Sequence, residues 1–222
     1  MKKKSLILFI AVTIIAAIFT LLVKTVDLGY VASTGSVVGF SSVNIPFSER
    51  FGFNEILCKV SEILGYIAFT VIAVFALIGL FQLIKGKSFK KVDSDLYALA
   101  LTYIFTIALY LFFDKVLVIN FRPLIAPGDL ALEPSFPSSH TLLSVVVFGT
   151  AISECGKINN RWIKGVFSFI LSILMAGTVL FRLFSGVHWV TDIVGGILWG
   201  EALMSLFQLF SSLLSRETDN TK

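Results

Sequence analysis

Six apolar runs, separated by short polar segments, dominate this sequence of 222 residues. Hydrophobic residues make up 56% of the chain and charged residues only 14%. A water-soluble domain of this length could not bury so much apolar surface, so lipid must cover part of it. The first run has 19 residues, which as a helix would nearly span a hydrocarbon core about 30 Å thick. The runs are Ser5–Val23, Ser61–Ile84, Leu96–Phe113, Thr141–Ser153, Gly165–Phe184 and Trp189–Phe210.

These runs predict an all-α fold, a bundle of six transmembrane helices. The fourth run is short, so its helix must borrow a polar first turn that begins near Ser138 or Ser139. The opening "MKKK" is also compatible with a secretory signal, but the run that follows exceeds the usual apolar length and lacks a clean cleavage site. We therefore expect a retained helix. No internal repeat or linker divides the chain, which predicts one integral-membrane domain over residues 1–222.

The distribution of Lys and Arg predicts the orientation of the bundle. With a cytoplasmic N-terminus, 12 of the 18 Lys and Arg residues fall on the inner side, as the positive-inside rule requires. Both termini are therefore expected in the cytoplasm, in a multi-pass protein of the plasma or inner membrane. Basic inner loops beside anionic lipid account for the net charge of +4, so no nucleic-acid partner is indicated, and no obligate protein partner is evident. The six outer cations are Lys24, Arg50, Lys59, Lys115, Arg122 and Arg182.

Prolines and histidines gather at the outer ends of the spans. All five prolines lie outside the spans, four of them in the segment Pro123–Pro137, which should be stiff and non-helical. The helix that follows begins at Ser138 or Ser139, and a helix N-terminus offers free backbone N–H groups to an anion. The chain contains two histidines, His140 and His188, and both are expected at this outer surface.

Charged residues converge on the same surface. Asp192 follows His188 by four residues, which places both on one helical face. Lys115, Arg122 and Arg182 end neighbouring spans. Any one of these residues could be a snorkelling anchor or half of an i, i+4 pair. Neither interpretation explains why the histidines and the three cations all converge on one face of the membrane. We therefore favour an anion-binding site.

Read in order, the chain gives Lys115-x6-Arg122-Pro123, then Pro137-Ser138-Ser139-His140, then Arg182-x5-His188-x3-Asp192. This pattern resembles the three-part signature of the type 2 phosphatidic-acid phosphatase superfamily, whose membrane branch contains lipid phosphate and undecaprenyl pyrophosphate phosphatases. Two positions depart from the usual pattern: Ser139 stands where the family normally has Gly, and Phe181 where it normally has Ser. Ser139 still supplies a backbone N–H, whereas no role is carried over to Phe181.

The resemblance implies a metal-independent phosphatase without a cofactor, acting on a membrane lipid at the outer leaflet. His188 would be the nucleophile that forms a phosphohistidine, and Asp192 would orient its imidazole. His140 would protonate the leaving group and then activate water. The phosphate-binding residues would be Lys115, Arg122, Arg182, Ser138 and Ser139. Undecaprenyl pyrophosphate, phosphatidylglycerol phosphate and phosphatidic acid all fit as substrates. The two lone cysteines, Cys58 and Cys155, give no metal-binding pattern.

Two other function classes remain open. A non-enzymatic transporter of anions or lipids is supported by Glu201, about 18 Å down the sixth span, although we favour a structural hydrogen bond from Glu201 to a neighbouring helix. A vanadium-dependent haloperoxidase shares the superfamily's pocket, but such enzymes are soluble and the six spans argue against it. Gly196-x3-Gly200 suits close helix packing.

Two outer segments have weaker patterns. "GSVVGFSS", residues 35–42, lacks the Gly-Lys-Ser/Thr of a P-loop and is expected to be a plain outer loop. Asn54–Leu64 is expected either to lie along the outer interface or to form a simple prelude to the second span.

Overall fold

A computed structural model describes residues 2–123 and 132–219 of the chain, the last four of these by their backbone alone. The structure is mostly helical, at 78%. In chain order its elements are α1 (Lys2–Thr25), β1 (Gly29–Val31), β2 (Ser36–Val38), α2 (Ser41–Phe51), α3 (Glu55–Gly86), the 3-10 turn η1 (Phe89–Lys91), α4 (Ser94–Leu111), the π-helical turn η2 (Phe112–Val116), α5 (Ser139–Cys155), α6 (Arg161–Phe184) and α7 (Val190–Asp219).

The predicted spans correspond to helices of the structure. In the described part of the chain, five helices are long and apolar enough to cross a membrane: α1, α3, α4 with η2, α6 and α7. The remaining expected span is α5, a shorter apolar helix of 17 residues. It begins at Ser139 with Ser138 at the N-cap position, as predicted for a short run that needs a polar first turn.

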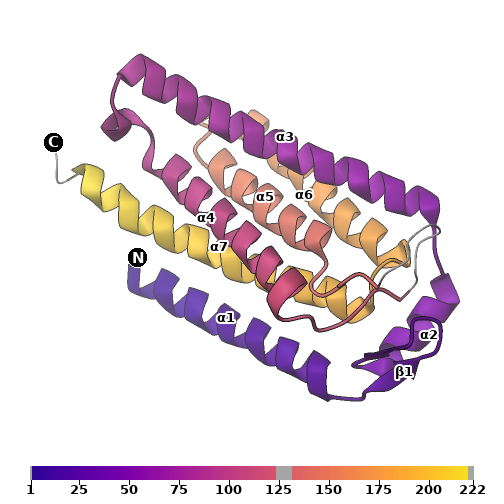
Figure 1. Cartoon of the computed structure of the whole chain (residues 1–222). Coiled ribbons are helices and arrows are strands. Elements are labelled where there is room, and N and C mark those ends of the chain that lie inside the picture. The colour runs from indigo at the N-terminus through magenta and orange to yellow at the C-terminus, as the bar shows by residue number, and fades with distance from the viewer. Residues whose placement is uncertain (1, 124–131, 220–222) are drawn as a thin grey trace.

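Helix α5 lies in the middle of the bundle (Figure 1). Ten of its residues are buried, and it packs against α3, α6 and α7. Two glycines let α7 approach it closely: a Cβ at Gly196 would lie 2.9 Å from the Cβ of Thr141, and one at Gly200 would lie 2.7 Å from the Cβ of Val145. The expected close packing at this small-x3-small pair is therefore confirmed.

A short β-hairpin, which was not predicted, accompanies the mostly helical fold. Strands β1 and β2 pair antiparallel, and Val31 and Val38 of the hairpin pack against Trp189 at the start of α7. The segment 35–42 is therefore not a plain loop, because it holds β2 and the first residues of α2. Val38 of this segment is buried against Trp189, a contact between distant parts of the chain that the local sequence does not reveal.

The start of α3 reaches the connection between α6 and α7. Asn54 caps the helix by accepting a hydrogen bond from the Leu57 N–H at 3.0 Å, and its own N–H donates to the Ser185 carbonyl at 2.9 Å. The helix then continues without a break from Glu55, so of the two expectations for Asn54–Leu64 the prelude to the second span is the one observed.

The two ends of the bundle differ in character. The first residues of α1 and the last of α7 lie at one end, and the hairpin lies at the other (Figure 1). At the end with the termini, Lys157 pairs with Asp95 and, at 2.7 Å, with Glu154, which ties α4 to α5. The predicted signature residues lie at the hairpin end.

Candidate active site

Four chain segments bring the signature residues together. The turn η2 carries Lys115, the α5 N-terminus carries Ser139 and His140, and the α6–α7 connection carries His188. Between them, segment 120–122 runs antiparallel to segment 133–135, with the Arg122 N–H donating to the Glu133 carbonyl at 2.9 Å. The rest of the predicted Pro-rich loop, including Pro127, falls on residues 124–131 and lies outside the described residues.

A polar cavity of about 530 Å³ lies among these segments. Four of the predicted site residues line it, namely Lys115, Arg122, Ser139 and His188. Ser139 is in the first turn of α5, whose backbone N–H groups have no partner within the helix. These N–H groups therefore lie at the cavity wall. The cavity thus combines two cations, a helix N-terminus and an imidazole, which suits an anion.

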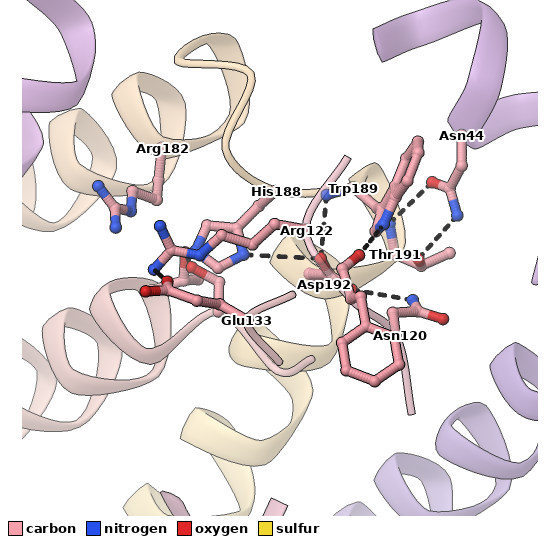
Figure 2. Close-up of polar contacts among 12 residues, drawn as sticks. Asn44, Asn120, Arg122, Glu133, Arg182, His188, Trp189, Thr191 and Asp192 are labelled. Carbon is pink, nitrogen blue, oxygen red and sulfur yellow. Dashed lines mark hydrogen bonds and ion pairs between the residues drawn. The ribbon is translucent and has the colours of Figure 1, made fainter. Parts of the chain in front are cut away.

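His188, which lines the cavity, and Asp192 form a buried pair (Figure 2). The Nδ1 atom of His188 lies 3.6 Å from Asp192 Oδ2, beyond hydrogen-bond distance, and both ring nitrogens are buried without a hydrogen-bond partner in the described structure. Asp192 is held by hydrogen bonds of 3.0 Å from Asn120 Nδ2 and from the Trp189 N–H. Burial lowers the pKa of His188, although Asp192 acts in the opposite direction. The imidazole is therefore neutral at pH 7, with a nitrogen lone pair available.

The two cations of the cavity wall carry carboxylate partners that the sequence reasoning did not foresee. Arg122 pairs with Glu133 at 2.9 Å, and Lys115 pairs with Asp114 at 2.8 Å. Both pairs are partly exposed, so an incoming anion can replace the carboxylates at little cost.

Arg182 lies in a different environment, because it is 3% exposed and does not line the polar cavity. Its NH1 donates to Ser61 Oγ at 3.1 Å and to Cys58 Sγ at 3.6 Å, both on α3, while its Nε has no partner. Within the described residues it makes no ion pair with a carboxylate. A buried guanidinium with no carboxylate in direct contact is costly, and an anion bound next to it would relieve that cost.

His140 faces a second cavity of about 480 Å³ between α3, α4 and α5. Its wall is mostly apolar, with Phe69, Ile107 and Leu143 among its residues, and Glu62 is its single charged residue among those described. Tyr110 and Ser139 line both cavities, so the two meet there. Ser139, the residue before His140, is one of these two shared residues. His140 therefore stands at the boundary between a polar and an apolar space.

Ser138 occupies a structural position below the cavity. It is fully buried, its N–H donates to the Asp192 carbonyl at 3.0 Å, and its Oγ accepts from Thr141 Oγ1 at 3.1 Å. These contacts fasten the start of α5 to α7. Of the two predicted serines, only Ser139 reaches the cavity wall.

Several residues of the site were missed by the sequence reasoning. Asn120 holds Asp192, Asn44 contacts Thr191 through its side chain at 2.9 Å, and the Trp189 Nε1–H donates to the Phe121 carbonyl at 2.6 Å (Figure 2). Asn44 and Asn120 are each 1% exposed. A buried amide must find hydrogen-bond partners, but the sequence alone does not show that these two amides are buried.

Glu201 does not make the expected hydrogen bond to a neighbouring helix. Its side chain is exposed on α7 and makes no hydrogen bond or ion pair among the described residues. It lines neither cavity. Among the described residues, no group of three or more His, Cys, Asp and Glu could hold a metal ion.

Comparison with known proteins decides the family. The family model described as "PAP2 superfamily" matches residues 96–214, more than half of the chain. The chain belongs to the PAP2 superfamily. This PAP2 protein also resembles a solved structure described as the first transmembrane PAP2 type phosphatidylglycerolphosphate phosphatase from Bacillus subtilis. The two share 19% sequence identity and a TM-score of 0.67, over 94% of this chain and 98% of that one. No curated protein sequence matches the chain closely enough to be compared.

Together the family and the apolar helices identify a multi-pass membrane protein with a PAP2 phosphatase fold. The family model begins at Leu96, so it includes the signature residues and α4 to α7 but leaves out α1 to α3. The likeness to the solved structure extends over those first three helices as well.

Proposed function

We propose that this PAP2 protein hydrolyses a lipid phosphate at the outer leaflet of the cell membrane through a phosphohistidine on His188. The observation that carries the proposal is the position of His188. It lines the cavity together with Lys115 and Arg122, the Asp192 carboxylate lies 3.6 Å from its Nδ1, and both of its ring nitrogens are buried without a hydrogen-bond partner in the described structure. A neutral imidazole held in this way is an activated nucleophile.

In the first step, His188 Nε2 attacks the phosphorus and the bond from phosphorus to the leaving oxygen breaks. Arg122, Lys115 and the first-turn N–H groups of α5 stabilise the charge on the phosphoryl oxygens. Arg182 adds a buried positive charge from the side of α3. His140, at the boundary between the two cavities, donates a proton to the leaving oxygen.

In the second step, water attacks the phosphohistidine. His140 now accepts a proton from that water, the phosphorus–nitrogen bond breaks, and inorganic phosphate leaves the polar cavity. The Asp192 carboxylate stabilises the positive imidazole while the phosphoryl group is attached to it. Both steps use the same residues, with His140 first an acid and then a base.

The second cavity provides a place for the lipid. It is mostly apolar and lies beside α3 and α4, which make little contact with each other, so a lipid chain can enter from the bilayer. Its only described links to the polar cavity are Tyr110 and Ser139. A lipid phosphate bound across this junction would place its leaving oxygen next to His140, which supports the role proposed for that residue.

Release of inorganic phosphate by the purified protein tests the proposal. The substrates would be phosphatidylglycerol phosphate, phosphatidic acid and undecaprenyl pyrophosphate in detergent micelles, with His188→Ala as the control. Release from at least one lipid by the wild type, with none from His188→Ala, is expected. If the folded wild type binds these lipids without releasing phosphate, the proposal is wrong and a non-enzymatic anion or lipid transporter is favoured instead.

A further inference from the structure

We infer that the outer half of α3 is part of the active site, with Ser61 positioning Arg182 and Gly65 positioning His140. The inference rests on the proposed function. Helix α3 precedes every signature residue and lies outside the segment matched by the family model. Its contribution comes entirely from contacts between α3 and residues more than seventy positions later in the chain.

Ser61 fixes the guanidinium of Arg182. Ser61 is fully buried, and its Oγ accepts a hydrogen bond from Arg182 NH1 at 3.1 Å. The same hydroxyl donates its own proton to the Cys58 carbonyl at 2.7 Å. Because that proton is already committed, the hydroxyl presents a lone pair to Arg182 and acts there as an acceptor. The only other polar contact of the Arg182 side chain in the described structure is with Cys58 Sγ, which is also on α3.

This anchoring determines which part of Arg182 is free. With NH1 held by α3, the Nε of Arg182 remains buried and without a partner. A planar guanidinium held at one nitrogen has its remaining N–H groups fixed in direction. Ser61 therefore aims Arg182, and its Nε and NH2, neither of which donates a hydrogen bond to a described residue, are the groups left to bind a phosphoryl oxygen.

Gly65 gives His140 its position. A Cβ at Gly65 would lie 3.0 Å from His140 Cδ2 and 3.3 Å from its Nε2, closer than packed atoms normally approach. The imidazole therefore rests directly against the backbone of α3, in space that a side chain would fill. Because Gly65 follows Ser61 by four residues, both lie on one face of the helix. One face of α3 thus positions two residues of the site, Arg182 and His140.

Ser61→Ala and Gly65→Ala test the two contacts separately, because Arg182 is proposed to act on the phosphoryl group and His140 on the leaving oxygen. Arg182 stabilises the transferred phosphoryl group whatever the leaving group is. Ser61→Ala should therefore lower the first-turnover rate about ten-fold, as expected when a charged donor loses its acceptor, equally for a lipid phosphate and for p-nitrophenyl phosphate. His140 protonates the leaving oxygen, and nitrophenolate leaves without that proton. Gly65→Ala should therefore slow the lipid substrate at least ten times more than p-nitrophenyl phosphate, within the range for loss of a general acid.

Helix α3 also offers matched controls. Thr70→Ala removes a hydroxyl whose hydrogen bond, 3.0 Å to the Tyr66 carbonyl, stays within the helix. Gly79→Ala adds a methyl group whose nearest neighbour, Leu96 Cδ1, lies at an ordinary 3.7 Å. Both controls should keep the wild-type rate with both substrates. A double variant adds a further check: if Ser61 acts through Arg182, Ser61→Ala should cause little further loss in an Arg182→Lys background.

The outcomes separate the inference from the proposed function. A wild-type protein that releases no phosphate from any substrate contradicts the function itself. An active wild type in which Ser61→Ala and Gly65→Ala behave like the two controls overturns the inference alone. A loss in Gly65→Ala that is equal for both substrates also overturns it, since that would indicate a general structural effect. Thermal unfolding in detergent identifies any variant that does not fold. If Gly65→Ala does not fold, the inference is tested by comparing the effect of Ser61→Ala in the wild type with its effect in the Arg182→Lys background.

Discussion

The carboxylate of Asp192 lies one helical turn after His188, with its Oδ2 3.6 Å from His188 Nδ1. Both side chains are buried, and hydrogen bonds from Asn120 and from the Trp189 N–H fix the carboxylate in place. In the proposed mechanism, Nε2 is the nitrogen that attacks the substrate, and this arrangement places a negative charge beside the imidazole as it becomes positive.

Asp192→Asn tests this arrangement. An amide cannot stabilise the positive imidazole of a phosphohistidine, so kcat should fall by up to about 10⁴-fold, the loss seen when a serine-protease triad undergoes the same change. Asn120→Ala, which removes one donor to the carboxylate and leaves its charge, should lose far less. Steady-state kinetics on both variants, with thermal unfolding as a check of folding, gives the comparison. Equal losses in the two variants would contradict an electrostatic role for Asp192.

The proposed roles of the two histidines make different predictions. His188→Ala should abolish turnover, because no covalent intermediate can form without the nucleophile. His140→Ala should lower turnover of a lipid substrate by about 10²- to 10⁴-fold, since a lipid alcohol needs a proton to leave. With p-nitrophenyl phosphate as substrate, the first step of His140→Ala should be slowed much less. Water attack on the phosphoenzyme should remain slow in this variant.

Rapid-quench measurements distinguish these roles. His140→Ala should give a burst of nitrophenolate and accumulate phosphohistidine, and His188→Ala should give neither. Phosphoenzyme trapped in His188→Ala instead would mean that the two roles are exchanged.

The membrane helices were predictable from the sequence, whereas much of the site was not. Lipid requires a long apolar run for each span, and this is why α1, for example, extends the run Ser5–Val23 by only a few residues at each end. The signature spacing also indicated that Arg122 and His188 would meet, and they line one cavity.

The residues that were missed depend on distant contacts. Ser61 meets Arg182 across 121 positions of sequence, and Asn120 meets Asp192 across 72. A lone serine or asparagine has no periodicity that points to its partner. Glu133 could not be assigned to Arg122 either, because the pairing depends on the antiparallel bridge between Phe121 and Pro134.

The pKa of His188 can be measured directly. Since the chain has two histidines, His140→Ala expressed without a histidine tag leaves only the His188 signal in an NMR titration. Burial lowers the pKa of His188, so the midpoint should lie below the ordinary value of about 6.5. The unfolded chain in denaturant should titrate near that ordinary value.

The same shift makes stability depend on pH. Because the pKa of His188 is lower in the folded protein than in the unfolded chain, the unfolded chain binds more protons below about pH 6.5. The contribution of His188 is therefore fully present above that pH and is lost as the pH falls. A folded-state midpoint above 6.5 would contradict both expectations.

The orientation predicted from the Lys and Arg distribution determines which positions a membrane-impermeant thiol reagent should reach. In a background with Cys58→Ser and Cys155→Ser, a cysteine at Ser33, exposed next to the hairpin, should react in intact cells. A cysteine at Asn159, exposed at the opposite end between α5 and α6, should react only after the membrane is opened. The reverse pattern would place the candidate site, with Lys115, His140 and His188, in the cytoplasm.

The last prediction concerns inhibition and metal ions. Phosphoryl transfer to His188 passes through a five-coordinate phosphorus, and vanadate adopts that coordination when a nitrogen donor such as Nε2 occupies one apex. The cavity holds Lys115, Arg122 and the N-terminal turn of α5 to balance the charge of its oxygens. Vanadate should therefore inhibit competitively, and Arg122→Gln, which removes one of these charges, should weaken vanadate binding and phosphate-ester turnover together. Since the proposed steps use only side chains and backbone N–H groups, activity should persist in excess EDTA. Activity that disappears in EDTA and returns with Mg²⁺ would show that a metal ion carries the charge assigned here to Lys115, Arg122 and Arg182.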